Sequence, residues 1–83
     1  MRAVTLEYPD EVLISLKASA EKFTQELKML AAVKLFELGK LSSGRAAQLA
    51  GVSRAEFLLA LGYYRVSPFH FTAEELDRDV FNA

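Results

Sequence analysis

The chain has 83 residues, no cysteine and a formal net charge of −1, and 52% of its residues are hydrophobic. This length predicts a single small domain, and the lack of cysteine excludes disulfides and thiolate metal sites. No apolar run approaches the ~20 residues of a membrane-spanning helix, and no signal-peptide pattern opens the chain. We therefore expect a cytoplasmic protein without a membrane segment, and its apolar excess indicates burial against a partner or a second copy.

The first segment is predicted to be a short β-strand. Val4, Leu6 and Tyr8 alternate with more polar residues, and Pro9 ends the pattern because it cannot donate to a ladder. A single strand needs a second strand to be stable. We expect it to pair with the same strand of another copy, in a homodimer; the alternative is the weakly alternating segment Val66–Phe71 of the same chain.

Two helices are predicted next. Asp10 is a candidate N-cap for a short turn at Glu11–Leu16, and Ser19 for a long helix at Ala20–Leu38. Gly39 follows as the residue that ends the long helix with a positive φ. Apolar residues at helical spacing give this helix one apolar face: Phe23, Leu27, Leu30, Ala31, Leu35 and Leu38. Val33 and Phe36 either widen that face or form a dimer seam.

A helix-turn-helix is predicted within residues 41–63. The segments Ser43–Ala50 and Arg54–Leu61 flank the break Gly51-Val52-Ser53. Gly51 supplies a left-handed residue, small Ala47 lets the helices cross closely, and Ser53 can cap the second helix. We expect the two helices to share a core made by Ala46, Ala50, Val52, Phe57 and Ala60.

The charges of this region indicate DNA binding. Residues 34–54 carry a net charge of +3, because Glu37 is the one acid among four bases. In such a motif the start of the second helix meets base edges, and Arg54 suits guanine. The residues assigned to DNA, at base edges or phosphates, are Lys40, Ser42, Ser43, Arg45, Ser53 and Arg54. The alternative is a packing scaffold for protein interaction, because the second helix is rich in leucine.

The C-terminal tail, residues 64–83, contains an extended apolar piece and then an acidic segment of net charge −3 from Thr72 onward. Thr72 and Glu75 form a capping box that predicts a short acidic helix over Ala73–Val80. This tail could lie across a basic partner through Phe69, Phe71, Glu74, Glu75, Asp77 and Phe81. The alternative is that its phenylalanines pack on the chain's own core.

No catalytic or metal site is expected. His70 is the sole histidine, so it has no second histidine or cysteine to complete a nucleophilic site. The acids of the tail lack the turn glycine of a calcium loop. We therefore expect neither enzyme activity nor a cofactor.

Three stretches carry a resemblance to a known family: Val4–Val12 (VTLEYPDEV), Ala31–Leu58 and Thr72–Val80 (TAEELDRDV). The chain resembles UPF0175, a family of short, antitoxin-like helix-turn-helix proteins of bacteria and archaea. The resemblance implies an antitoxin that neutralises a nuclease-like toxin of PIN fold, encoded next door, and that represses its own operon. The expected domain is mainly α, with residues 1–40 for dimerisation, 41–63 as helix-turn-helix and 64–83 as the tail.

Overall fold

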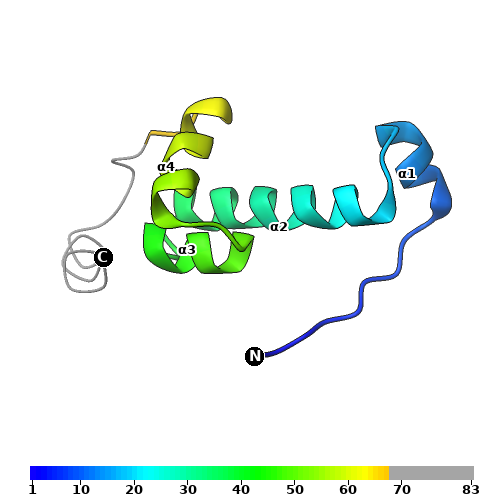
Figure 1. Cartoon of the computed structure of the whole chain (residues 1–83), viewed down its shortest axis with the longest axis horizontal. Coiled ribbons are helices and arrows are strands. Elements are labelled where there is room, and N and C mark those ends of the chain that lie inside the picture. The colour runs from blue at the N-terminus through cyan, green and yellow to red at the C-terminus, as the bar shows by residue number, and fades with distance from the viewer. Residues whose placement is uncertain (68–83) are drawn as a thin grey trace.

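The computed structural model describes residues 1–67, which form four α-helices, one of them much longer than the others (Figure 1). These are α1 (Asp10–Leu16), α2 (Ala20–Glu37), α3 (Ser43–Ala50) and α4 (Arg54–Tyr63). Helix α2 is about 27 Å long, and both α1 and α3 pack against it. Helix α3 lies beside one half of it, α4 rises steeply from that same half, and α1 lies at the opposite end (Figure 1). The expectation of a mainly helical chain is confirmed.

Local capping chemistry sets the bounds of α1 and α2. Helix α1 ends where Lys17 adopts a left-handed conformation with φ 53°. Ser19 then caps α2 by accepting a hydrogen bond of 3.2 Å from the Lys22 amide, as predicted. The prediction for α1 was wrong by one position, because Pro9 is the N-cap residue and Asp10 is already helical.

The end of α2 turns the chain back toward α3. Gly39 has φ 75°, and its amide donates to the Phe36 carbonyl over 3.0 Å. The next amide, of Lys40, donates to the Leu35 carbonyl over 2.9 Å. A side chain would be strained at Gly39, so the predicted role of this glycine is confirmed.

The core lies between the second half of α2 and helices α3 and α4. It consists of eight buried residues: Ala32, Val33, Phe36, Ala46, Ala47, Ala50, Phe57 and Leu61. The rings of Phe36 and Phe57 meet edge to face at 5.7 Å. Three of these residues are alanines of α3, and their small side chains allow close helix packing in this core.

The predicted apolar face of α2 was only partly right. Val33 and Phe36, considered as a dimer seam, are 6% and 0% exposed within the single chain and belong to its own core. Leu27, Leu30 and Leu38, expected on the buried face, remain 38–56% exposed. The physical reason is that α2 is apolar around much of its surface, and the docking of α3 and α4 selects which part is buried.

The predicted turn of the helix-turn-helix is present around Gly51. This residue has φ 77°, and its amide donates to the Ala47 carbonyl over 2.9 Å. Helix α3 has the predicted bounds, and α4 extends two residues further than Leu61, to Tyr63. Ser53 caps α4 by accepting from the Glu56 amide over 3.1 Å, as predicted.

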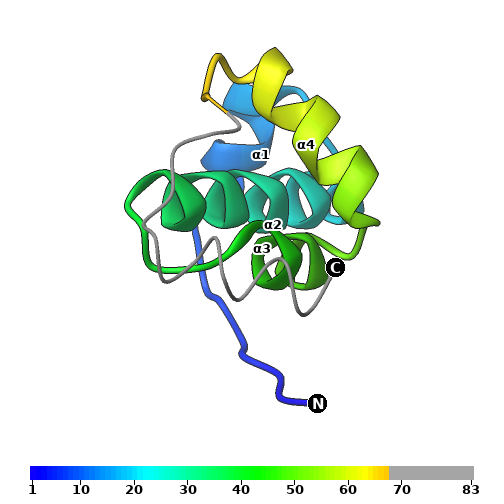
Figure 2. The ribbon, with the colours of Figure 1, turned by 90° about the vertical axis from the view of Figure 1, so that its left-hand side faces the viewer.

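The first nine residues, called the N-terminal arm below, are extended and lie outside any helix. The arm leads away from α1, on the same side of α2 as α3 (Figures 1 and 2). Tyr8 anchors it to α2, with its ring 4.8 Å from that of Phe23. The predicted strand does not form among residues 1–67 of the single chain.

Two predictions concern the end of the chain. The acidic helix at Ala73–Val80 lies outside the described residues, as does most of the alternative strand partner Val66–Phe71.

Within residues 1–67, no helix combines the length and apolar character needed to cross a membrane.

Candidate nucleic-acid interface

The start of α3 is built by two buried serines. Ser42 has extended backbone angles and accepts a hydrogen bond of 3.2 Å from the Arg45 amide, which makes it the N-cap residue. Ser42 and Ser43 are only 3% and 2% exposed. Both were assigned to phosphate contacts, and the structure places them beneath the surface as supports of the helix start.

Arg54 links the start of α4 to the start of α3. Its Nε donates a hydrogen bond of 2.9 Å to the Oγ of Ser43, eleven positions earlier in the chain. The N-termini of the two helices therefore lie within the reach of one arginine side chain. Arg54 itself is exposed to solvent.

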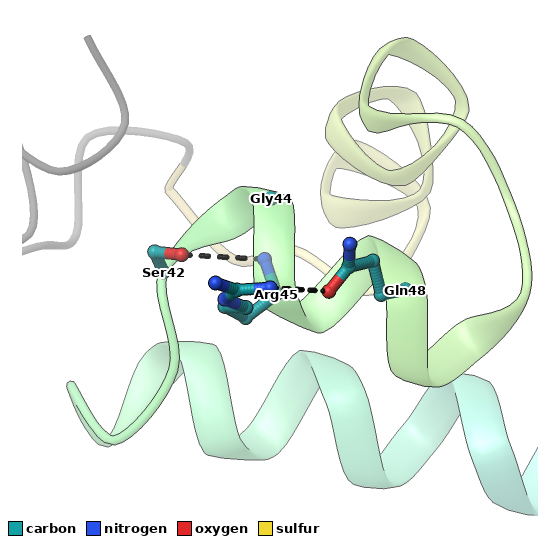
Figure 3. Close-up of a pocket in the computed structure, with 4 residues that line it drawn as sticks. All are labelled: Ser42, Gly44, Arg45 and Gln48. Atoms are coloured by element: carbon teal, nitrogen blue, oxygen red, sulfur yellow. Dashed lines mark hydrogen bonds between the residues drawn. The ribbon is translucent and has the colours of Figure 1, made fainter. Parts of the chain in front are cut away.

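Arg45 lies along the outer surface of α3. Its Nη1 donates a hydrogen bond of 2.9 Å to Oε1 of Gln48, one turn further along the helix. Figure 3 shows the four residues that line a pocket at this helix start: Ser42, Gly44, Arg45 and Gln48. Arg45 is the charged residue among them.

The charges around these two helix starts favour an anionic ligand. Lys40, Arg45 and Arg54 are all exposed. Each helix N-terminus adds partial positive charge from amides without helical acceptors. Glu56, exposed in the first turn of α4, is the opposing charge. The contact with Ser43 brings Arg54 to the start of α3, and Lys40 and Arg45 flank that start in the sequence.

The rest of the exposed surface of α4 has a different character. Leu59 and Tyr63 are 79% and 82% exposed, and Ala55 and Gly62 are exposed as well. Arg54 is the only basic residue within α4. Base reading by polar side chains would therefore be confined to the first turn of this helix.

Of the six residues assigned to DNA, four are at the surface and two are buried. Lys40, Arg45, Ser53 and Arg54 are exposed, and Ser53 uses its side chain as a cap. Sequence reasoning missed Gln48, although its position three residues after Arg45 is the spacing of side chains that meet on a helix. The assigned partner-binding residues Phe69, Phe71, Glu74, Glu75, Asp77 and Phe81 lie outside the described part of the chain.

No metal site is built among residues 1–67, where no group of three or more His, Cys, Asp or Glu side chains gathers. The chemistry that the described surface offers is hydrogen bonding and charge attraction by arginine and lysine.

Comparison with known proteins settles the family. The model of the uncharacterised protein family UPF0175 matches residues 1–83. The chain belongs to the UPF0175 family. This confirms the resemblance seen in the sequence.

Similar UPF0175 proteins occur in two archaea. A UPF0175 protein of Archaeoglobus fulgidus is 34% identical over 77 residues, which cover 93% of this chain and 85% of that protein. One from Aeropyrum pernix is 30% identical over 79 residues, covering 95% and 83%. Another from Aeropyrum pernix is 34% identical over 73 residues, covering 84% and 92%. No solved structure gives a significant match.

Proposed function

We propose that this UPF0175 protein is a DNA-binding regulator of the antitoxin kind, acting as a homodimer in the cytoplasm. The observation that carries the proposal is the hydrogen bond from Arg54 Nε to Ser43 Oγ. It holds the one cation of α4 against the start of α3, and the exposed Lys40 and Arg45 flank that start in the sequence. The proposal assigns no catalytic step to the protein.

The proposed binding mode places the first turn of α4 in the major groove. Arg54 would present its guanidinium to the O6 and N7 atoms of a guanine. Lys40 and Arg45 would contact phosphates on either side of the groove, which fixes position without reading sequence. The buried serines would keep the helix starts in place rather than contact DNA themselves.

A single copy has few cations for this task. Binding energy from phosphate contacts falls steeply as salt increases, and the loss grows with the number of contacts. Three exposed cations on one copy would give weak binding at physiological salt, and two copies on one site double the contacts. The proposal therefore requires a dimer on a two-fold symmetric operator.

The antitoxin part of the proposal rests on the family resemblance and on the charge of the tail. Residues 72–83 carry a net charge of −3. We propose that this acidic tail, with Phe69, Phe71 and Phe81, occupies the basic cleft of a nuclease-like toxin of PIN fold encoded next door. Acidic side chains there would take the place of the nucleic-acid substrate.

A salt titration of DNA binding tests the first part. Wild type should retard the DNA upstream of its own gene, and binding should weaken as salt rises. Arg54→Ala should reduce affinity at least tenfold, whereas Lys22→Ala, which removes a cation at the opposite end of α2, should leave it nearly unchanged. No retardation by wild type, or equal losses in both variants, would refute DNA binding through this surface.

Co-purification with the product of the neighbouring gene tests the second part. The full chain should bind that product, and a chain truncated before Val66 should not. If the truncated chain still co-purifies, the tail does not carry the interaction.

One observation favours a second candidate, a protein-interaction module that uses the helix-turn-helix as a scaffold. Leu59 and Tyr63 leave an apolar surface on α4 that DNA would not match. In that case Leu59→Lys should abolish binding of the neighbouring gene product, and no salt-dependent DNA binding should be measurable.

A further inference from the structure

One face of the N-terminal arm is apolar and lies toward the first half of α2. Val4, Leu6 and Tyr8 line a groove together with Phe23 and Leu27 of α2. Since successive side chains of an extended chain point to opposite sides, Ala3, Thr5 and Glu7 belong to the other face. The arm therefore has the two-sided character of a strand although it has no neighbouring strand among residues 1–67.

Residues 1–67 leave the groove and the arm partly uncovered. Val4 and Leu6 are 92% and 55% exposed, and Leu27 and Leu30 on α2 are 38% and 48% exposed. No backbone hydrogen bond among the described residues joins the arm before Pro9 to another segment. An unpaired extended segment with one apolar face is a template for pairing with another strand.

We propose that residues 3–8 pair in antiparallel orientation with the same residues of a second copy. The two-stranded ribbon then covers the exposed apolar side chains of α2, including Leu27 and Leu30, in both copies. A second copy fits because it offers the same alternation of apolar and polar residues. A two-fold axis makes such a patch complementary to itself. The proposal stands whether or not the protein binds DNA.

The alternation also restricts the register of the ribbon. Directly opposed residues of an antiparallel pair point to the same side, and a shift of one position would move apolar residues to the wrong face. The two-fold axis must therefore pass midway between one residue and its own copy, so that this residue lies opposite itself in the ribbon. Near the centre of the segment this residue is Thr5 or Leu6. An axis between the two copies of Glu7 would place two like charges opposite each other.

The outer face of the ribbon consists of Ala3, Thr5 and Glu7, which include an acid and no base. Proteins that read DNA with a β-ribbon insert it into a groove between phosphates, and this face offers no cation to them. The ribbon therefore assembles the dimer and leaves nucleic-acid contact to the helix-turn-helix.

Single cysteines in this cysteine-free chain test the register without any DNA. Opposed residues have Cβ atoms about 4.5–5.5 Å apart, so a small movement of the strands reaches the distance of about 3.5–4.5 Å that a disulfide requires. Under mild oxidation, either Thr5→Cys or Leu6→Cys should form a covalent dimer at least tenfold faster than Ile14→Cys. Ile14, 73% exposed on α1, is the matched control for an accessible apolar position. Equal rates in all three variants would overturn the proposal.

Two asparagine variants test which face is buried. Leu6→Asn places a polar group on the apolar face, and Thr5→Asn places the same group on the outer face. By sedimentation at micromolar concentration, wild type and Thr5→Asn should have twice the chain mass of 9.2 kDa, and Leu6→Asn the mass of one chain. Neither residue belongs to the buried core, so helical circular dichroism should persist. A monomeric wild type, or a dimer lost in Thr5→Asn but kept in Leu6→Asn, would refute the ribbon.

Discussion

The two halves of the molecule contain apolar residues throughout but bury them very differently. Every buried hydrophobic side chain among residues 1–67 lies between Ala32 and Leu61. The arm, α1 and the first half of α2 contribute none, although they expose Val4, Leu6, Ile14 and Leu27. The difference indicates that the second half of α2 and the helix-turn-helix are stable through a shared core, whereas the N-terminal half needs an added surface to bury its side chains.

The largest expected effect tests the core itself. Phe36→Ala removes a ring that is 0% exposed and packs on Phe57, and should cost about 3–5 kcal/mol. Phe23→Ala, at a half-buried position on the other half of α2, should cost about 1 kcal/mol in a single chain. Urea unfolding followed by circular dichroism measures both losses.

Protein concentration sharpens this contrast. The loss from Phe36→Ala should not depend on concentration, because its partners lie in the same chain. A loss from Phe23→Ala that grows with concentration would measure burial by a second copy. If Phe36→Ala and Phe23→Ala lose equal free energy of unfolding in dilute solution, the division into two halves is contradicted.

A pair of glycine variants compares the left-handed turn at Gly51 with the exposed helical position Gly62 on α4. Gly51→Ala should destabilise by about 1–2 kcal/mol because an L-residue is strained in the left-handed region. The added Cβ itself would meet only Lys28 Nζ, at an ordinary 3.6 Å. Gly62→Ala should stabilise by about 0.5–1 kcal/mol, since alanine favours the helix and nothing lies within 4 Å of its Cβ. A raised thermal midpoint in Gly51→Ala would contradict the first argument, and a lowered one in Gly62→Ala would contradict the second.

The capping serines give a smaller contrast. Ser42→Ala and Ser19→Ala should each cost about 0.5–2 kcal/mol. The buried Ser42 should lie at the upper end of this range and the exposed Ser19 at the lower end. Amide exchange should accelerate at Arg45 in the first variant and at Lys22 in the second, because these amides lose their acceptors. If Ser19→Ala is the more damaging, the start of α2 is better supported than its exposure indicates.

Much of this fold could be predicted because its boundaries are set by neighbouring residues. Ser19, Gly39, Gly51 and Ser53 act within one helical turn of their own position, so sequence spacing alone reveals them. The buried side of α2 could not be predicted in the same way. Its apolar residues surround the helix, and the position of α3 and α4 decides which of them are covered.

The candidate site was predictable in part for the same reason. The exposed cations Lys40, Arg45 and Arg54 follow from the charge pattern of residues 34–54. The roles of Ser42 and Ser43 did not follow, because a serine before a helix can cap it or face a ligand. The contact of Arg54 with Ser43 spans eleven positions and depends on how the two helices cross, which no local rule fixes.

The smallest expected effect tests a link between the two halves. Burial raises the pKa of Tyr64 above its ordinary value of 10.0, with further contributions from Tyr63 and from Glu26 in the first half of α2. The folded chain then keeps a proton that the unfolded chain has lost. The free energy of unfolding should therefore fall as pH rises above about 10, with no contribution from this group at neutral pH.

Glu26→Gln should lower the pKa of Tyr64 in an NMR titration, leaving it above 10.0 because burial is the larger cause. Glu21→Gln, an exposed acid at the start of the same helix, is the matched control and should leave this pKa unchanged. Equal shifts in both variants would mean that the end of α4 responds to overall charge and has no specific link to the N-terminal half.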